Sequence, residues 1–184
     1  MKVLLLFLLM SLFSVGQKGR NCSEVEGVDI SKEDLTSDYT GPVKECDGNN
    51  TTRYYCMYKN GKKHGMEKYW GLAGDLIGKG KFIDGKPVGT HREWQDEGEL
   101  IAKIRYKNGL KHGKSMVWYR WYEFSGEERK GQLLDVTLYK NGKKEGRSLV
   151  YHMNGQISQD VYYENDKRVS GMCYNQFGAY IPCQ

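Results

Sequence analysis

A repeat of 24 residues constrains the fold of this chain more than any other feature of the sequence. Four segments share an aromatic residue, then Asn-Gly or Asp-Gly, and a glycine seven positions after the aromatic residue. They start at Tyr58, Phe82, Tyr106 and Tyr139, and a degenerate copy starts at Tyr163. The steps between these starts are 24, 24, 33 and 24 residues, so the third copy carries an insertion. Chance does not produce this register.

Further positions of the unit recur in the same register. The glycines are Gly65, Gly89, Gly113 and Gly146, and the aromatic residues twelve positions after each start are Trp70, Trp94, Trp118 and Tyr151. Gly41 stands 24 residues before Gly65, which indicates a degenerate repeat before the one that starts at Tyr58. We therefore expect a degenerate first repeat at 34–57, four repeats at 58–162 with an insertion near 121–129, and a degenerate C-terminal capping repeat at 163–184.

Each unit has the pattern of two short strands. The segments before and after Asp96-Glu97-Gly98 have β-type composition, and Asn-Gly is a strong turn dipeptide. The chain contains 23 glycines and 14 tyrosines but 3 prolines, a composition that favours strands and tight turns over helices. The prediction is an all-β fold, an elongated single-layer antiparallel sheet of stacked 24-residue β-hairpin repeats. The recurring glycines are expected to need positive φ or close backbone approach.

The first 16 residues have the pattern of a signal peptide. Lys2 precedes an apolar run from Val3 to Phe13, and Ser14-Val15-Gly16 supplies small residues for cleavage. The alternative is a retained membrane anchor, but the run is shorter than the roughly 20 residues that span a bilayer. We therefore expect no transmembrane span and an exported protein that is periplasmic, outer-membrane-associated or secreted. Residues 17–33 form an N-terminal segment before the repeats.

The repeat resembles a known family. Its pattern Y-x-N-G-K-x-x-G, an aromatic residue five positions later and then G-x-L is similar to the MORN variant repeat, including bacterial proteins labelled as YwqK-type antitoxins. The resemblance covers most of residues 34–172. It implies a MORN-like solenoid, a curved sheet of stacked hairpins that serves as a membrane-associated or protein-binding scaffold. An antitoxin-like partner of a toxin protein is a further implied role, although toxin neutralisation normally takes place in the cytoplasm.

The five cysteines lie at the two ends of the chain, and none falls between residues 57 and 172. In an exported chain we expect them to be oxidised. Stacked strands place the two groups about 40 Å apart, so each must pair locally. Cys46 and Cys56 have the same spacing as Cys173 and Cys183, and we predict both of these disulfides, with Cys22 left over. A metal site is the rival interpretation, but no C-x-x-C motif is present and we expect no metal or cofactor.

The sequence contains no pattern of catalytic residues. His64 and His112 occupy the same repeat position, two units and on the order of 20 Å apart, and they have the character of turn residues. No serine or cysteine lies in a nucleophile motif. We therefore predict that the protein is not an enzyme.

Recurring aromatic residues are the first candidate for a binding surface. We expect them to form a ladder on one face, which serves as core and as a partly exposed surface for another protein. The candidate residues are Tyr58, Trp70, Phe82, Trp94, Tyr106, Trp118, Trp121, Tyr139 and Tyr151. Trp121 belongs to the insertion, and insertions into repeats often form the distinctive contact. The alternative is that the rings are core alone.

Basic residues in the connecting turns are the second candidate. This basic turn ladder consists of Lys62, Lys63, Lys86, Lys111, Lys143, Lys144, Lys167 and Arg168. With a formal net charge of +5, it could meet an anionic membrane lipid or an acidic polymer such as a glycan. We expect no nucleic-acid partner. The alternative is that these lysines protect sheet edges against aggregation.

Overall fold

The computed structural model describes residues 19–30, 34–95, 98–120 and 131–183. The predicted signal peptide at 1–16, Asp96-Glu97 and the insertion with Trp121 lie outside these described residues.

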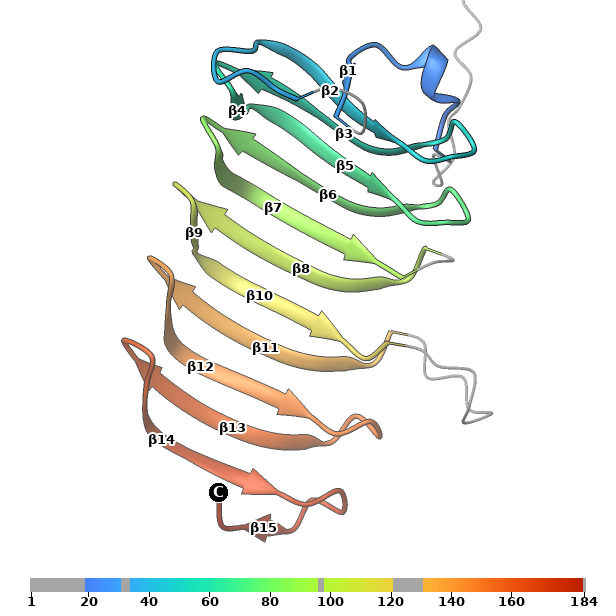
Figure 1. The fold of residues 1–184 in the computed structure, drawn as a ribbon. Coiled ribbons are helices and arrows are strands. Elements are labelled where there is room, and N and C mark those ends of the chain that lie inside the picture. The colour runs from blue at the N-terminus through green and yellow to red at the C-terminus, as the bar shows by residue number, and fades with distance from the viewer. Residues whose placement is uncertain (1–18, 31–33, 96–97, 121–130, 184) are drawn as a thin grey trace, which may run out of the picture.

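A single open sheet contains all the strands of the described residues, and no second layer covers it (Figure 1). The predicted all-β fold is therefore confirmed. The strands pair as antiparallel neighbours in chain order from β2 to β15, except that β4 and β9 pair only with β3 and β8, and β1 pairs with β2 in parallel. The strands are β1 (Val28–Asp29), β2 (Gly41–Cys46), β3 (Thr52–Lys59), β4 (Lys62–Lys63), β5 (Gly65–Trp70), β6 (Leu76–Ile83), β7 (Lys86–Trp94), β8 (Leu100–Lys107), β9 (Leu110–Lys111), β10 (Gly113–Trp118), β11 (Leu133–Lys140), β12 (Lys143–Tyr151), β13 (Ile157–Glu164), β14 (Lys167–Tyr174) and β15 (Tyr180–Ile181).

Two-residue turns connect the hairpins along one edge of the sheet. Asn60 and Gly61 both have positive φ, of 49° and 68°, and Asn141 and Gly142 repeat this at 52° and 89°. Positive φ at both central residues is the type I′ geometry, which matches the right-handed twist of neighbouring strands. This requirement explains why Asn-Gly recurs in the sequence. Each turn also bonds to the preceding unit, since the Gly142 N–H donates to the Lys111 carbonyl (2.8 Å).

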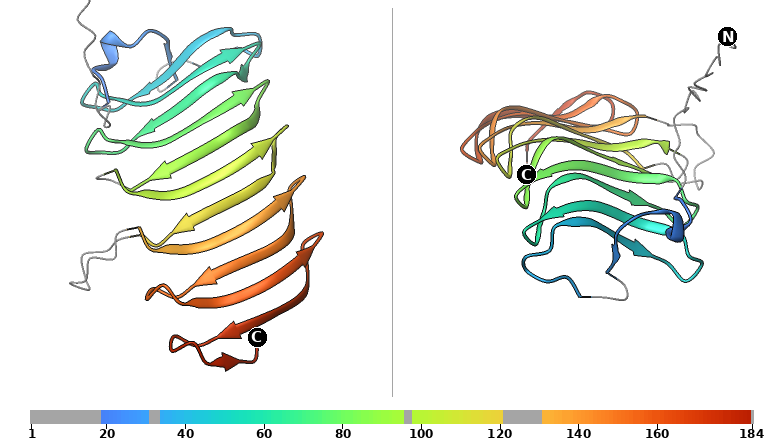
Figure 2. Two further views of the ribbon diagram at one scale, coloured as in Figure 1. Left: turned by 180° about the vertical axis from the view of Figure 1, so that it is seen from behind. Right: turned by 90° about the horizontal axis from the view of Figure 1, so that it is seen from above.

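A β-bulge recurs near the opposite edge, at the aromatic position of each hairpin. The register shifts between Tyr69 and Trp70, and again at Trp94, Trp118 and Tyr151. Bulges bend the strand that carries them and increase its twist. Their repetition at one register accompanies the bowed strands and the curved, stacked sheet seen in Figure 2.

Cross-strand register assigns the side chains to two faces. Small or polar residues in the middle of one face are almost inaccessible: Thr137 is 2% exposed and Glu67 5%. A single layer can shield side chains to this degree only on the inside of its bend, so we call this the inner face. The central inner-face positions include Glu67, Ser115, Thr137, Ser148 and Val161. The side chains that alternate with them lie on the outer face.

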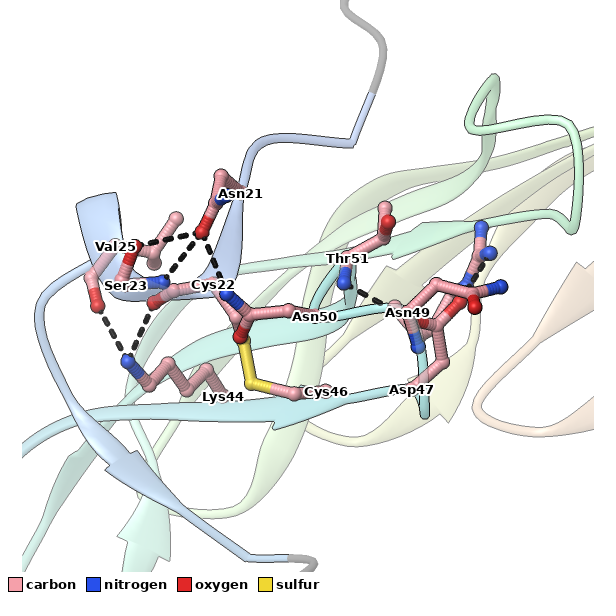
Figure 3. Close-up of a disulfide and its surroundings, with 11 residues drawn as sticks. Asn21, Cys22, Ser23, Val25, Lys44, Cys46, Asp47, Asn49, Asn50 and Thr51 are labelled. Carbon is pink, nitrogen blue, oxygen red and sulfur yellow. Dashed lines mark hydrogen bonds and ion pairs between the residues drawn. A yellow bond between two sulfur atoms is a disulfide. The ribbon is translucent and has the colours of Figure 1, made fainter.

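The N-terminal segment closes the first unit. The short helix η1 (Cys22–Glu24) lies against Lys44, whose ammonium group donates to the carbonyls of Cys22 and Val25, both at 2.7 Å (Figure 3). Strand β1 then pairs with the free edge of β2. On the inner face of this unit, apolar side chains pack on a buried cluster. The packed residues are Ile30, Leu35, Tyr39 and Tyr58, and the cluster consists of Val43, Tyr54 and Cys56.

The prediction of a Cys46–Cys56 disulfide is wrong. Cys46 is bonded to Cys22 (Figure 3), and Cys56 is a buried free thiol. The register explains the error, because Val43 and not Cys46 lies opposite Cys56. Cys46 shares the outer face with Lys44, whereas Cys56 shares the inner face with Val43. The predicted Cys173–Cys183 disulfide is confirmed, with Cα atoms 5.3 Å apart.

Candidate binding surfaces

The histidines of the repeat contact backbone groups of neighbouring turns. The N–H of Asn141 donates to Nδ1 of His112 (3.4 Å), and in the next unit the N–H of Asn165 donates to the carboxylate of Glu145 (2.9 Å). Thr40 has the same role in the first unit, where its hydroxyl accepts from the N–H of Asn60 (2.9 Å). This repeat position therefore links consecutive turns and is structural.

Aromatic side chains form a row along the inner face, which we call the inner aromatic row. It consists of Tyr58, Phe82, Tyr106, Tyr139 and Tyr163. Lysine ammonium groups lie over several of its rings: Lys63 is 5.3 Å from the centre of Phe82, and Lys111 is 5.1 Å from that of Tyr139. Lys144 lies 4.8 Å from Tyr163 in the same way. The row thus presents alternating rings and cations.

The predicted single ladder of aromatic residues is wrong, because the twelve-position aromatic residues lie on the outer face. Glu93 pairs with Ala102 on the inner face, so the next residue, Trp94, points outward, where Lys79 lies 5.3 Å from its ring centre. Trp70, Trp94, Trp118 and Tyr151 form this outer aromatic row. The two rows are therefore separate surfaces.

Hydroxyl groups line the middle of the inner face beside the aromatic row. Thr137 bonds to Ser148 (2.8 Å) and to the carboxylate of Asp135 (2.9 Å). Burial raises the pKa of Asp135, while the bond from Thr137 and the charges of nearby lysines oppose the shift. Ser115 lies opposite Thr137, and its buried hydroxyl has no hydrogen-bond partner among the described residues. These hydroxyls are 2–5% exposed, so they belong to the packing of the inner face rather than to its accessible surface.

A hollow lies beside Gly78, over which the ring of Tyr69 packs. Glu67, Tyr69, His91 and Glu93 are among the residues that line this hollow. Burial is the largest cause that raises the pKa of Tyr69, followed by its hydrogen bond with Glu67. The hollow offers carboxylates and an imidazole.

The basic turn ladder is divided by the structure. The ladder residues at the second position after the turn glycine point to rings of the inner aromatic row; they are Lys63, Lys111 and Lys144. Its exposed members are Lys62, Lys86, Lys143, Lys167 and Arg168. Leu110, which is 50% exposed, stands between two of them and breaks the positive stripe.

A second set of cations, which the sequence interpretation missed, crosses the outer face. Lys68 lies directly opposite Lys79, Lys79 opposite Arg92, and Arg92 opposite Lys103. We call Lys68, Lys79, Arg92 and Lys103 the outer cation row. No short-range motif marks it, since its members become neighbours only through the register of four strands.

One cluster of described residues has the spacing of metal ligands, namely Cys22, Asp29 and Cys46. Its two sulfur atoms form the disulfide described above, so the pair is not available as thiolates.

No protein-family model matches this sequence, and no curated protein is significantly similar to it. Among the described residues, no helix has the length and apolar character that crossing a lipid bilayer requires. The surfaces above therefore carry the functional argument alone.

Proposed function

We propose that this chain is an exported, non-catalytic repeat scaffold that binds a protein partner along its inner face. The inner aromatic row carries the proposal. Its rings recur once per unit, with ammonium groups of Lys63, Lys111 and Lys144 at about the distance of a cation–π contact. Stacked repeats commonly use such extended concave surfaces for binding.

The chain itself covers this face only in the first unit, as far as the described residues extend. There, Leu35 and Tyr39 pack on the cluster around Val43. In the later units, Tyr106 and Tyr139 remain partly exposed. Partly exposed rings and cations on one face suit a polypeptide with apolar and acidic side chains.

Export is supported by the two disulfides, because disulfides persist in oxidising compartments. A periplasmic, outer-membrane-associated or secreted location fits them equally. The resemblance to MORN variant repeats agrees with a scaffold role, and an antitoxin-like partnership would be one form of it.

Site-specific photo-crosslinking in the native host tests this proposal. A benzophenone amino acid replaces Tyr139 on the inner face or, as a matched control, Leu149 on the outer face. We expect one protein adduct that forms from position 139 and not from position 149. Crosslinks from position 149 alone, or the absence of protein adducts from position 139, would contradict an inner-face protein partner.

A further inference from the structure

The outer cation row places like charges in direct contact positions. Side chains directly opposite each other on antiparallel strands have Cβ atoms about 5 Å apart, and like charges there are destabilising. Three such pairs follow one another from Lys68 through Lys79 and Arg92 to Lys103. Lys81 and Arg105, two positions along their strands, share this face.

No carboxylate within these four strands neutralises the row. Their acidic residues, Glu67 and Glu93, belong to the inner face. None of the four cations forms an ion pair or side-chain hydrogen bond with another described residue, and Lys79 contacts the ring of Trp94. Carboxylates share a hollow with members of the row at two places, Glu24 and Glu26 with Lys68, and Glu67 and Glu93 with Lys79 and Arg92. Among the described residues, no carboxylate lies within ion-pair distance of the row.

We propose that the outer face of β5–β8 binds a linear acidic polysaccharide, with its carboxylates paired to the outer cation row. The cations recur once per strand, about 4.8 Å apart, in a line across the sheet. A chain of sugars bearing uronate groups supplies negative charge in a matching line. The indole of Trp94 lies beside Lys79 and offers an apolar surface for a sugar ring. This surface is distinct from the inner face, so the inference is independent of the protein partner proposed above.

The shape of the surface favours a flexible chain over a membrane. The row is a single line of cations that a polymer can follow, whereas a bilayer would also cover the uncharged Met66 and Thr90, which lie two positions along their strands from Lys68 and Arg92. Exposed cations at the turns, such as Lys62 and Lys86, lie at the sheet edge and do not extend the row. The predicted export also places the protein where acidic polysaccharides occur rather than nucleic acids.

Binding of the exported chain, with its disulfides formed, to polygalacturonate tests the inference. The variant Lys79→Gln/Arg92→Gln removes the two central cations, and Lys62→Gln/Lys86→Gln removes the same charge from the turns. We expect the first variant to weaken binding by about tenfold or more and the second by less than about twofold, since pairing with a polyanion depends on local contacts. Binding should also fall as salt rises, and neutral dextran should not bind. Circular dichroism checks that both variants fold.

Three results would overturn the proposal. The first is no binding to polygalacturonate at low salt. The second is equal weakening by the two variants, which would indicate a response to net charge. The third is binding to phosphatidylglycerol vesicles or single-stranded DNA without binding to polygalacturonate, which would assign the row to a membrane or a nucleic acid. None of these results bears on photo-crosslinking from Tyr139, so this inference and the inner-face proposal fail separately.

Discussion

Cys22 and Cys46, joined by a disulfide with Cα atoms 6.0 Å apart, are separated by 24 residues, the period of the repeat. Cys46 in turn stands 24 residues before Trp70. The disulfide therefore links the N-terminal segment to the first repeat, at the outer-face position where the next three units carry an indole. A terminal unit lacks a neighbour on one side, and a covalent link compensates for that missing contact.

Removing this link should destabilise the N-terminal end. In Cys22→Ser/Cys46→Ser we expect the free energy of unfolding to fall by about 3 kcal/mol, because a closed loop of this length restricts the unfolded chain by about that amount. Guanidinium denaturation measures the change. Peptide mapping without reductant should recover Cys22 linked to Cys46 and Cys173 linked to Cys183. A Cys46–Cys56 peptide would contradict the structure.

The imidazole of His91 leaves no room for a side chain at Gly80. A Cβ atom at Gly80 would lie 2.0 Å from Nδ1 of His91, whose ring packs between those of Phe82 and Tyr106 at 5.2 and 4.8 Å. Gly80→Ala should cost about 1–3 kcal/mol of stability, the usual range for overpacking. Gly48→Ala is the control, since no atom lies within 4 Å of the added methyl group.

A double-mutant cycle identifies the cause of this cost. In a His91→Ala background the space next to Gly80 is vacant, so Gly80→Ala should cost much less than in the wild type. Equal costs in both backgrounds would show that the imidazole does not set the requirement.

Tyr54 should make the fold sensitive to alkali. Tyr54 is 6% exposed, and this burial raises the pKa of its phenol above its ordinary value near 10. Smaller effects in the same direction come from Tyr58, Cys56 and Glu67. Above about pH 10 the unfolded chain therefore loses this proton first, and stability declines as pH rises toward the folded-state pKa. Below pH 10 both states keep the proton and the contribution of Tyr54 is constant.

Urea denaturation between pH 8 and 11 tests this expectation. Tyr54→Phe should have a shallower alkaline decline than the wild type, because its ring cannot ionise. Tyr180→Phe, at a position that is 68% exposed, is the control and should follow the wild-type curve. Identical slopes for Tyr54→Phe and the wild type would show that burial of this phenol has no role.

The repeat period determined the fold because each recurring residue acts locally. Asn60-Gly61 sets a type I′ turn through its own φ angles, and Gly65, with φ of 123°, lies in the left-handed region as expected for the recurring glycine. Such requirements are visible in one unit and confirmed by the next. This is why the all-β architecture could be predicted without any contact information.

The surfaces could not be predicted in the same way, because they depend on register between strands. Two features decide whether Trp94 shares a face with Phe82: the bulge beside Trp94, and the residue that lies opposite Phe82 on the next strand. The spacing of residues along the sequence reveals neither of them. The same limit applies to Cys46 and Cys56, whose ten-residue spacing matched the C-terminal pair while their side chains lie on opposite faces. A shift of one residue moves a whole strand's side chains to the other face.

The outer cation row should lower stability for the same reason that it suits an anionic ligand. Lys79 has a like charge opposite it on each side, at Lys68 and Arg92. Lys79→Thr removes both repulsions and supplies a β-branched residue, so we expect a gain of about 0.2–1 kcal/mol in the free energy of unfolding at low salt. Salt screens exposed charges, so the difference from wild type should shrink at high ionic strength.

Denaturation of Lys79→Thr at low and high salt, beside Lys86→Thr, makes the comparison. Lys86 lies opposite Ile83 at the turn and should show little gain. A stabilised Lys79→Thr with weaker binding to polygalacturonate would identify the row as a site where stability is exchanged for binding. A loss of stability would instead mean that the contact of Lys79 with Trp94 outweighs the repulsion, and that the row is part of the packing of the sheet.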